Sequence, residues 1–272
     1  MQTFQVIGDP VDHSLSPLIH GAFAEQLGLD LPYTAQRVPG GSLRTYLAAL
    51  PDHVLGLNVT LPLKGEAYAA STGHSADARR AQSVNTLTRT EGGWLGDNTD
   101  GAGLVRDLDS NQGFVLAGRH ILVLGAGGAV RGIVGPLLDA GVARITVVNR
   151  TRATADRVAA QFGAGVIAHS MQRLDEITGH ALLINATSAG WSTASVTYPR
   201  SLFFGVELAY DLSYGRAAIA FLARARDCGV QQCTDGRGML VEQAAASFRL
   251  WHGVMPDTED VRQRVDARLA QR

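Results

Sequence analysis

One stretch near the middle of the chain restricts the fold more than any other. Residues 119–124 (Arg-His-Ile-Leu-Val-Leu) form an apolar, partly β-branched run, and a glycine-rich segment at 125–128 follows directly. A pattern typical of a helix comes next, so we predict a strand, a tight turn and a helix start. Glycines let the backbone approach a ligand closely there, and amides at a helix N-terminus favour a pyrophosphate. A second strand at 144–148 arrives about 20 residues later, as in a dinucleotide-binding βαβ unit.

The residues after that second strand indicate which dinucleotide is bound. The strict fingerprint G-x-G-x-x-G fails, because Val130 stands where the third glycine is expected. Asn149, Arg150 and Thr151 follow the second strand, where an NAD-preferring site usually places a carboxylate for the ribose 2′-hydroxyl. An arginine has a planar fork that can bind a 2′-phosphate instead. We therefore predict an NADP site, and a solvated basic turn is the alternative.

Charge and composition exclude several classes of protein. The formal net charge is −1 over 272 residues, so no overall field attracts nucleic acid or an anionic membrane. No apolar run approaches the ~20 residues of a membrane span, and no secretory signal is visible. The two cysteines, Cys228 and Cys233, fit no zinc or redox spacing, and the eight histidines form no cluster. We expect a cytoplasmic protein with no metal, nucleic-acid or membrane partner.

Two serines near the N-terminus flank a predicted helix start. Residues 3–7 indicate a strand, and Ser16 followed by Pro17 is a favourable N-cap pair. Ser14 and Ser16 would then place two hydroxyls at the positive end of a helix dipole, where they could bind a small carboxylate. A capping role without any ligand is the alternative.

Three other polar residues stand at the ends or edges of apolar segments. An extended run at 55–64 ends in Lys64, which is either a solvated strand-end residue or a lysine in a functional setting. Asp100 lies in a polar loop at 94–101, which is either an Asx turn or a catalytic loop. Gln243 lies near the apolar stripe of a helix expected at 240–251, as a surface residue or a ligand contact.

The remaining pattern predicts an α/β protein with two domains. Residues 1–101, completed by C-terminal helices at 238–272, form one domain, and residues 102–237 form the dinucleotide-binding domain. Predicted strands lie at 33–38, 83–89, 120–124, 144–148, 165–168, 181–185, 204–210 and 230–232, with a turn at 234–239. Predicted helices lie at 42–50, 102–112, 128–140, 152–162, 216–228 and 257–271. Ligands of parallel sheets bind beyond the carboxyl ends of the strands.

A set of short motifs, all in the right order, resembles the shikimate dehydrogenase family over nearly the whole chain. Each motif is weak by itself. They are Ser14-x-Ser16-Pro17, Asn58-Val-Thr60-x-Pro62-x-Lys64, Val84-Asn85-Thr86, Asp97-Asn-Thr-Asp100-Gly101, Gly125-x-Gly127-Gly128-Ala129, Asn149-Arg150-Thr151, Asn185-Ala-Thr187-Ser188-x-Gly190 and Gly238-Met239-Leu240-x-x-Gln243.

The resemblance implies an enzyme with an N-terminal α/β substrate domain, a Rossmann-like NADP-binding domain and an active-site cleft between them. It implies the reversible reduction of 3-dehydroshikimate to shikimate with NADPH, a step of chorismate and aromatic amino-acid biosynthesis. It assigns catalysis to Lys64 and Asp100. Substrate contacts fall on Ser14, Ser16, Thr60, Lys64, Asn85, Asp100, Tyr214 and Gln243. Cofactor contacts fall on Gly125, Ala126, Gly127, Gly128, Ala129, Asn149, Arg150, Thr151, Thr187, Leu212 and Gly236.

A few positions depart from the family pattern. Gly215 and Arg216 stand after Tyr214 where Asn-Pro is common, so we expect a loop of different shape there. Thr154 replaces a second basic residue, which would make the preference for NADP over NAD less strict. A quinate or other hydroxy-acid dehydrogenase and a catalytically silent nucleotide sensor remain as alternative functions. Both a monomer and a homodimer remain open.

Overall fold

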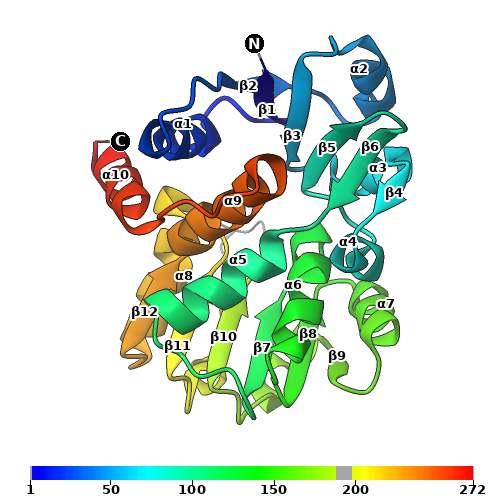
Figure 1. Cartoon of the computed structure of the whole chain (residues 1–272). Coiled ribbons are helices and arrows are strands. Elements are labelled where there is room, and N and C mark those ends of the chain that lie inside the picture. The colour runs from blue at the N-terminus through cyan, green and yellow to red at the C-terminus, as the bar shows by residue number, and fades with distance from the viewer. Residues whose placement is uncertain (1, 188–197, 272) are drawn as a thin grey trace. The chain divides into compact units, whose positions relative to one another are not determined.

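The computed structural model describes residues 2–187 and 198–271. Its contacts divide the chain into two units (Figure 1). Unit 1 consists of Met1–Leu104 and Leu240–Arg272, and unit 2 consists of Val105–Met239. None of the helices in the described part of the chain has the length and apolar character that crossing a bilayer requires. The motif residues Ser188 and Gly190 lie outside the described residues.

Unit 1 is built on a six-stranded mixed sheet in the order β2-β1-β3-β5-β6-β4. Its strands are β1 (Thr3–Gly8), β2 (Tyr33–Arg37), β3 (Val54–Val59), β4 (Gly73–His74), β5 (Thr86–Thr90) and β6 (Gly93–Asp97). β1 pairs in parallel with β2 and β3, whereas β5 runs antiparallel to both β3 and β6. Short hairpins allow antiparallel pairing, whereas parallel pairs need a crossover such as a helix.

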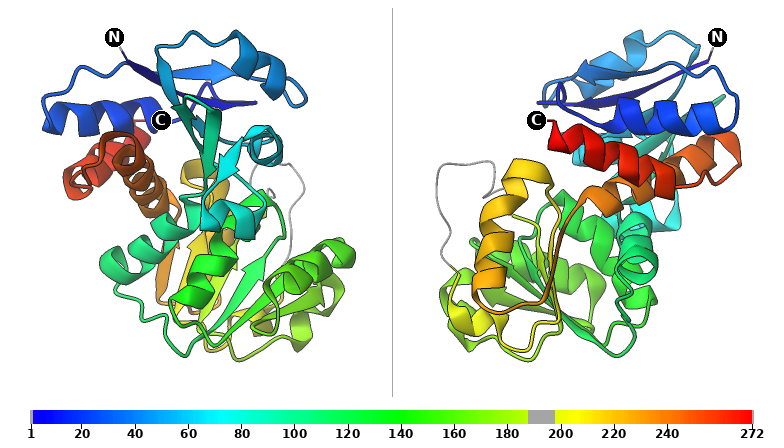
Figure 2. Two further views of the ribbon diagram at one scale, coloured as in Figure 1. Left: turned by 45° about the vertical axis from the view of Figure 1, so that its right-hand side comes forward. Right: turned by 90° about the vertical axis from the view of Figure 1, so that its left-hand side faces the viewer.

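Helices complete the hydrophobic core of unit 1. They are α1 (Ser16–Gln26), α2 (Leu43–Ala49), α3 (Lys64–Ala70), α4 (Ala76–Ala81), α5 (Asp100–Arg106), α9 (Arg237–His252) and α10 (Glu259–Ala270). Buried side chains of α2 and α3, such as Leu47 and Ala67, pack with Leu57 of β3 in one cluster. α10 lies beside α1 (Figure 2), and Arg264 and Glu25 form an ion pair between these helices. α5 and α9 contain the two points at which the chain passes between the units.

Unit 2 is a six-stranded sheet in the order β12-β11-β10-β7-β8-β9, and every neighbouring pair is parallel. Its strands are β7 (His120–Leu124), β8 (Arg144–Asn149), β9 (Val166–Ser170), β10 (Leu182–Asn185), β11 (Leu208–Asp211) and β12 (Gln232–Asp235). Its helical segments are the π-helix η1 (Asp107–Asn111), α6 (Gly128–Asp139), α7 (Arg152–Phe162), η2 (Met171–Glu176), η4 (Arg200–Phe203), η5 (Gly215–Ala218) and α8 (Ile219–Asp227). The predicted two-domain α/β fold class is confirmed.

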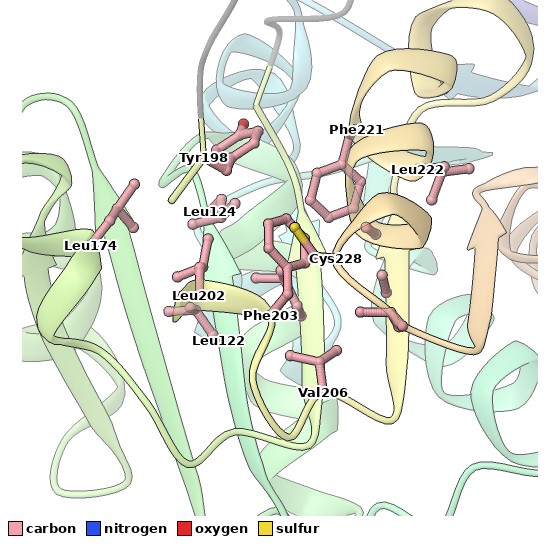
Figure 3. Packing of buried hydrophobic residues seen from close by; sticks show 14 of the residues in the cluster. Leu122, Leu124, Leu174, Tyr198, Leu202, Phe203, Val206, Phe221, Leu222 and Cys228 are labelled. Atoms are coloured by element: carbon pink, nitrogen blue, oxygen red, sulfur yellow. The ribbon is translucent and has the colours of Figure 1, made fainter. Parts of the chain in front are cut away.

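Both faces of the unit 2 sheet are buried, as expected for a parallel sheet. Leu122 and Leu124 of β7 belong to one core cluster with Phe221 of α8 (Figure 3). The alternate residues Ile121 and Val123 are equally buried and point to the other face, because successive side chains of a strand point to opposite sides. This double burial explains the unbroken apolar runs in the sequence of unit 2.

Several local predictions are wrong. Residues 204–207 are not strand, since β11 begins at Leu208, where it pairs with Leu182. The predicted turn at 234–239 is the end of β12 and the start of α9. Residues 93–97 form a strand rather than a polar loop, because Trp94 is buried in the unit 1 core. The extended run predicted at 55–64 ends at Val59, and Lys64 is the first residue of α3.

Candidate active site

Lys64 and Asp100 form a buried ion pair in unit 1. Each is the first residue of a short helix, Lys64 of α3 and Asp100 of α5. Lys64 Nζ lies 2.5 Å from Asp100 Oδ2, and the two side chains are only 14% and 7% exposed. Removing either partner would leave the other charge buried without its counter-ion, which is strongly unfavourable. The two residues therefore depend on each other structurally, whatever chemistry they perform.

Asn85 holds the second oxygen of that carboxylate. Asn85 Nδ2 donates to Asp100 Oδ1 at 2.9 Å, and Asn85 Oδ1 accepts from the Thr99 backbone N–H at 2.8 Å. Asn98 fixes the preceding loop, because its Oδ1 accepts from the Asp100 backbone N–H and its Nδ2 donates to Ser83 O. Both oxygens of Asp100 thus accept hydrogen bonds, and the carboxylate is held in one orientation.

Gln243 joins this group from α9. Its Oε1 accepts from Asn85 Nδ2 at 3.3 Å, and its Nε2 donates to Leu240 O at 2.8 Å. Gly103 of α5 makes this approach possible, because a Cβ on Gly103 would lie 2.6 Å from Gln243 Cβ. Gln243 is half-buried. The sequence predicts either a surface position or a ligand contact for Gln243. It does not predict the hydrogen bond to Asn85.

Ser14 and Ser16 lie together at the start of α1. Ser14 Oγ donates to Ser16 Oγ at 3.2 Å and accepts from the Ser16 backbone N–H at the same distance. The prediction that Ser16 is the N-cap is wrong, because Leu15 holds that position and no side chain caps the helix. Thr60 lies in the turn between β3 and α3, where its backbone N–H donates to Ile7 O.

Four of the predicted substrate or catalytic residues, Lys64, Asn85, Asp100 and Gln243, are thus joined by hydrogen bonds. Ser14 and Ser16 form a second group. Tyr214 belongs to unit 2, where it is half-buried just before η5. Ser247 also reaches the first of these groups, because its Oγ lies 3.1 Å from Thr99 Oγ1 and 3.1 Å from Gln243 O. Sequence reasoning does not single out Ser247, although it lies four residues after Gln243 and therefore on the same face of α9. That spacing is the signal that could have identified it.

The glycine turn of unit 2 has the geometry that the sequence predicts. Gly125 has a φ of 112°, and a Cβ there would lie 2.8 Å from Ala186 O, so glycine is required. α6 begins at Gly128 with Gly127 as its N-cap, and no side chain caps it. Ala126 and Ala129 flank these glycines. The first amides of a helix lack intrahelical partners, so this end is suited to a phosphate group.

The arginines after β8 differ in whether their side chains already have hydrogen-bond or ion-pair partners. Within residues 2–187 and 198–271, the Arg150 guanidinium has no hydrogen-bond or ion-pair partner, and the residue is exposed. Arg152 pairs with Asp156 at 2.8 Å, and Arg157 donates to Thr154 Oγ1. Asn149 Nδ2 donates to the backbone carbonyl of Thr151, which shapes the turn. Arg150 is therefore the arginine of this segment that can bind a 2′-phosphate without breaking an existing contact.

Further candidate cofactor contacts lie at the carboxyl edge of the unit 2 sheet. Thr187 N and Oγ1 both donate to Asn185 Oδ1. A Cβ on Gly236 would lie 2.3 Å from Leu212 O, so these two residues touch through their backbones. Burial raises the pKa of Asp211, the last residue of β11, to about 6, although Asn185 Nδ2 donates to it at 2.7 Å. Among the described residues, no three His, Cys, Asp or Glu side chains are placed to hold a metal ion.

Comparisons with known proteins agree across both units. Family models match at residues 6–87 (shikimate dehydrogenase substrate binding domain), 108–194 (shikimate / quinate 5-dehydrogenase) and 236–265 (shikimate 5′-dehydrogenase C-terminal domain). A shikimate dehydrogenase (NADP(+)) of Xanthomonas euvesicatoria pv. vesicatoria is 48% identical over 98% of this chain and 96% of its own length.

Solved structures show the same architecture. The Ael1 enzyme of Pseudomonas putida is 35% identical with a TM-score of 0.89, and the match covers 97% of this chain and 98% of that one. Shikimate 5-dehydrogenase of Thermus thermophilus, in complex with NADP(H) and shikimate, is 35% identical with a TM-score of 0.85 over 98% of this chain and 99% of that one. By sequence and by structure, the chain belongs to the shikimate dehydrogenase family.

Proposed function

We propose that this enzyme catalyses the reversible reduction of 3-dehydroshikimate to shikimate with NADPH. The observation that carries the proposal is the buried Lys64–Asp100 ion pair, an ammonium held in place beside a carboxylate. The relatives named as NADP(+)-dependent shikimate dehydrogenases support the substrate and the cofactor. The matching family model at residues 108–194 is named for shikimate and quinate, so quinate is the second candidate substrate.

The residues of unit 2 fit NADP(H). The uncapped start of α6 suits the pyrophosphate, and Arg150 is free to bind the 2′-phosphate. The other proposed contacts are Gly125, Ala126, Gly127, Gly128, Ala129, Asn149, Thr151, Thr187, Leu212 and Gly236. When bound, NADPH supplies the hydride that reduces the ketone.

The residues of unit 1 then stabilise the negative charge that develops on the substrate oxygen. A ketone that accepts a hydride becomes an alkoxide, which needs a proton. The Lys64 ammonium stabilises this charge and donates the proton, and as an amine it accepts the proton in the reverse direction. Asp100 keeps the ammonium in position through the 2.5 Å contact between Nζ and Oδ2. Lys64 and Asp100 are thus the proposed catalytic pair.

The other polar groups of unit 1 suit the remaining parts of a hydroxylated cyclic carboxylate. We assign the substrate carboxylate to the hydroxyls of Ser14 and Ser16, because neither hydroxyl is used to cap helix α1. We assign the ring hydroxyls to hydrogen bonds with the amides of Asn85 and Gln243 and with Thr60, because neutral hydroxyls need both donors and acceptors. Tyr214 of unit 2 is the remaining proposed contact.

Several finer expectations stay predictions. These are the domain boundaries at 1–101 with 238–272 and at 102–237, the active-site cleft, a cytoplasmic location and a homodimer. A cytoplasmic enzyme would have direct access to the NADPH pool that the reaction needs.

Steady-state kinetics test the proposal. Shikimate and quinate are each oxidised with NADP+ and with NAD+, and reduction of the nicotinamide is followed by absorbance. We expect the highest kcat/KM for shikimate with NADP+. The proposal is wrong if shikimate and NADP+ give no absorbance change. A higher kcat/KM for quinate would move the assignment to the second substrate.

A further inference from the structure

A second set of polar side chains is joined to the proposed catalytic pair through Asn85. It consists of Tyr33 on β2, Asn58 on β3, Thr86 on β5 and Ser247 on α9. Except for Tyr33, which is half-buried, these residues are buried. Buried polar groups must be hydrogen-bonded, so the direction of each bond can be worked out from the donors available.

The direction is set at Asn85. Its Oδ1 accepts from a backbone N–H, that of Thr99, and its Nδ2 faces the carboxylate of Asp100. Neither partner can exchange roles, since a backbone N–H only donates and a carboxylate only accepts. The Asn85 amide therefore cannot flip without losing both bonds.

The next contacts follow from this constraint. Thr86 Oγ1 lies 2.9 Å from Asn85 Oδ1, which carries no hydrogen, so Thr86 must donate there. The single hydroxyl hydrogen of Thr86 is then used, so its oxygen accepts from Asn58 Nδ2 at 3.3 Å and from Ser247 Oγ at 2.8 Å. Asn58 must therefore point its Nδ2 toward Thr86 and Ser247, and it donates to Ser247 Oγ at 3.0 Å.

Tyr33 is the first donor of this chain. Asn58 Oδ1 faces the phenol at 2.6 Å and carries no hydrogen, so Tyr33 donates. Burial raises the pKa of Tyr33 well above its ordinary value, and the phenol stays protonated. The ring is stacked on His20 with centroids 4.2 Å apart. The hydrogen bonds thus run one way, from Tyr33 through Asn58, Thr86 and Asn85 to Asp100.

We propose that Tyr33 is a positioning residue for the dehydrogenase reaction, acting through Asn58 and Thr86 to hold the Asn85 amide against Asp100. The inference rests on the proposed function. Hydrogen bonds in a chain polarise one another, so each donor strengthens the next. Without the phenol hydroxyl, Asn58 Oδ1 loses its donor, and only the contacts of Nδ2 with Thr86 and Ser247 still orient the amide. Thr86, and through it the Asn85 amide, would then be held less strictly in one orientation.

Substitution of Tyr33 by phenylalanine tests this chain, because the stacked ring stays and only the hydroxyl is lost. We expect Tyr33→Phe to lower kcat for shikimate by about fivefold to tenfold, as for the loss of one buried hydrogen bond. Variants of Thr86 separate this role from a merely structural one, because Thr86→Val keeps the packing and loses only the hydroxyl, whereas Thr86→Ser loses packing and keeps the hydroxyl.

Tyr46→Phe is the matched control. Tyr46 also belongs to unit 1, and its hydroxyl donates to Gln5 Oε1 at the same 2.6 Å, outside the chain described above. A second pair of variants tests the middle of the chain. Thr86→Val removes the hydroxyl and should reproduce the loss of kcat seen in Tyr33→Phe, whereas Thr86→Ser keeps the hydroxyl and should have a kcat close to that of the wild type.

Two outcomes overturn the inference. The first is an active wild-type enzyme in which Tyr33→Phe and Tyr46→Phe have the same kcat. The second is a Thr86→Ser variant as impaired as Thr86→Val. A wild-type enzyme inactive on shikimate and NADP+ would instead overturn the proposed function, and the positioning role with it.

Discussion

Acid should destabilise unit 1 through one buried histidine. His20 lies on α1, is only 4% exposed, and stacks on Tyr33 at an interplanar angle of 4°. Burial, and to a lesser extent the nearby His252, lowers the pKa of His20 from 6.5 to about 3. In the unfolded chain His20 takes up a proton near its ordinary pKa, whereas in the folded chain it stays neutral until about pH 3. Its contribution to stability is therefore complete above 6.5 and is lost progressively as the pH falls toward 3.

The size of the effect follows from the two pKa values. Between about pH 7.5 and about pH 5, His20 in the unfolded state becomes almost fully protonated while His20 in the folded state remains neutral. The linkage relation then predicts a loss of about 2 kcal/mol in the free energy of unfolding from this residue. Such a loss is a sizeable fraction of the ~5–15 kcal/mol that stabilises a typical protein.

Urea unfolding of wild type and His20→Phe at both pH values measures this loss. Phenylalanine keeps an aromatic ring against Tyr33 and removes the titrating group, and any packing cost cancels because each protein is compared with itself. In a Trp191→Phe background the two remaining tryptophans, Trp94 and Trp251, both belong to unit 1 and report its unfolding by fluorescence.

The wild type should lose about 2 kcal/mol more than His20→Phe between the two pH values. His53→Gln, a change at an exposed histidine of the same unit, should behave like the wild type. Equal losses in the wild type and His20→Phe would refute the reasoning and show that His20 is not held neutral by burial.

Three further substitutions, two of them with a matched control substitution, have expected outcomes. Lys64→Ala should lower kcat at least ~100-fold, measured by NADPH absorbance with shikimate, and near-normal turnover would rule out its catalytic role. Arg150→Ala should raise KM for NADP+ about tenfold or more without affecting KM for NAD+, because only NADP+ has the 2′-phosphate. Arg152→Ala, which removes an arginine already paired with an aspartate, should change KM for NADP+ much less. Gly103→Ala should lower the unfolding free energy by ~1–3 kcal/mol and raise KM for shikimate, because its Cβ would press on α9. Gly21→Ala, where nothing lies within 4 Å, should not destabilise, and equal losses at both glycines would contradict the steric argument.

Local sequence patterns were sufficient where local forces decide the structure. The strand at 120–124 and the helix at 152–162 have the predicted bounds, because apolar runs and helical periodicity are properties of adjacent residues. The patterns failed where a neighbouring element decides. Residues 204–207 resemble a strand, but the parallel ladder with β10 starts only at Leu208. Serine is a favoured N-cap residue, but Ser16 is already the first residue of α1, so Leu15 takes the N-cap position.

The sequence by itself determined which chemical groups the protein has and which family it belongs to. A lysine, a carboxylate, two serines and an arginine in place of an acidic residue can all be read from motifs. Only the tertiary structure decided that Lys64 Nζ lies 2.5 Å from Asp100 Oδ2, although the residues are 36 positions apart. It also decided the one-way chain of hydrogen bonds from Tyr33. A hydrogen bond needs a donor and an acceptor about 3 Å apart and aligned, and that geometry depends on the packing of strands and helices from distant parts of the chain.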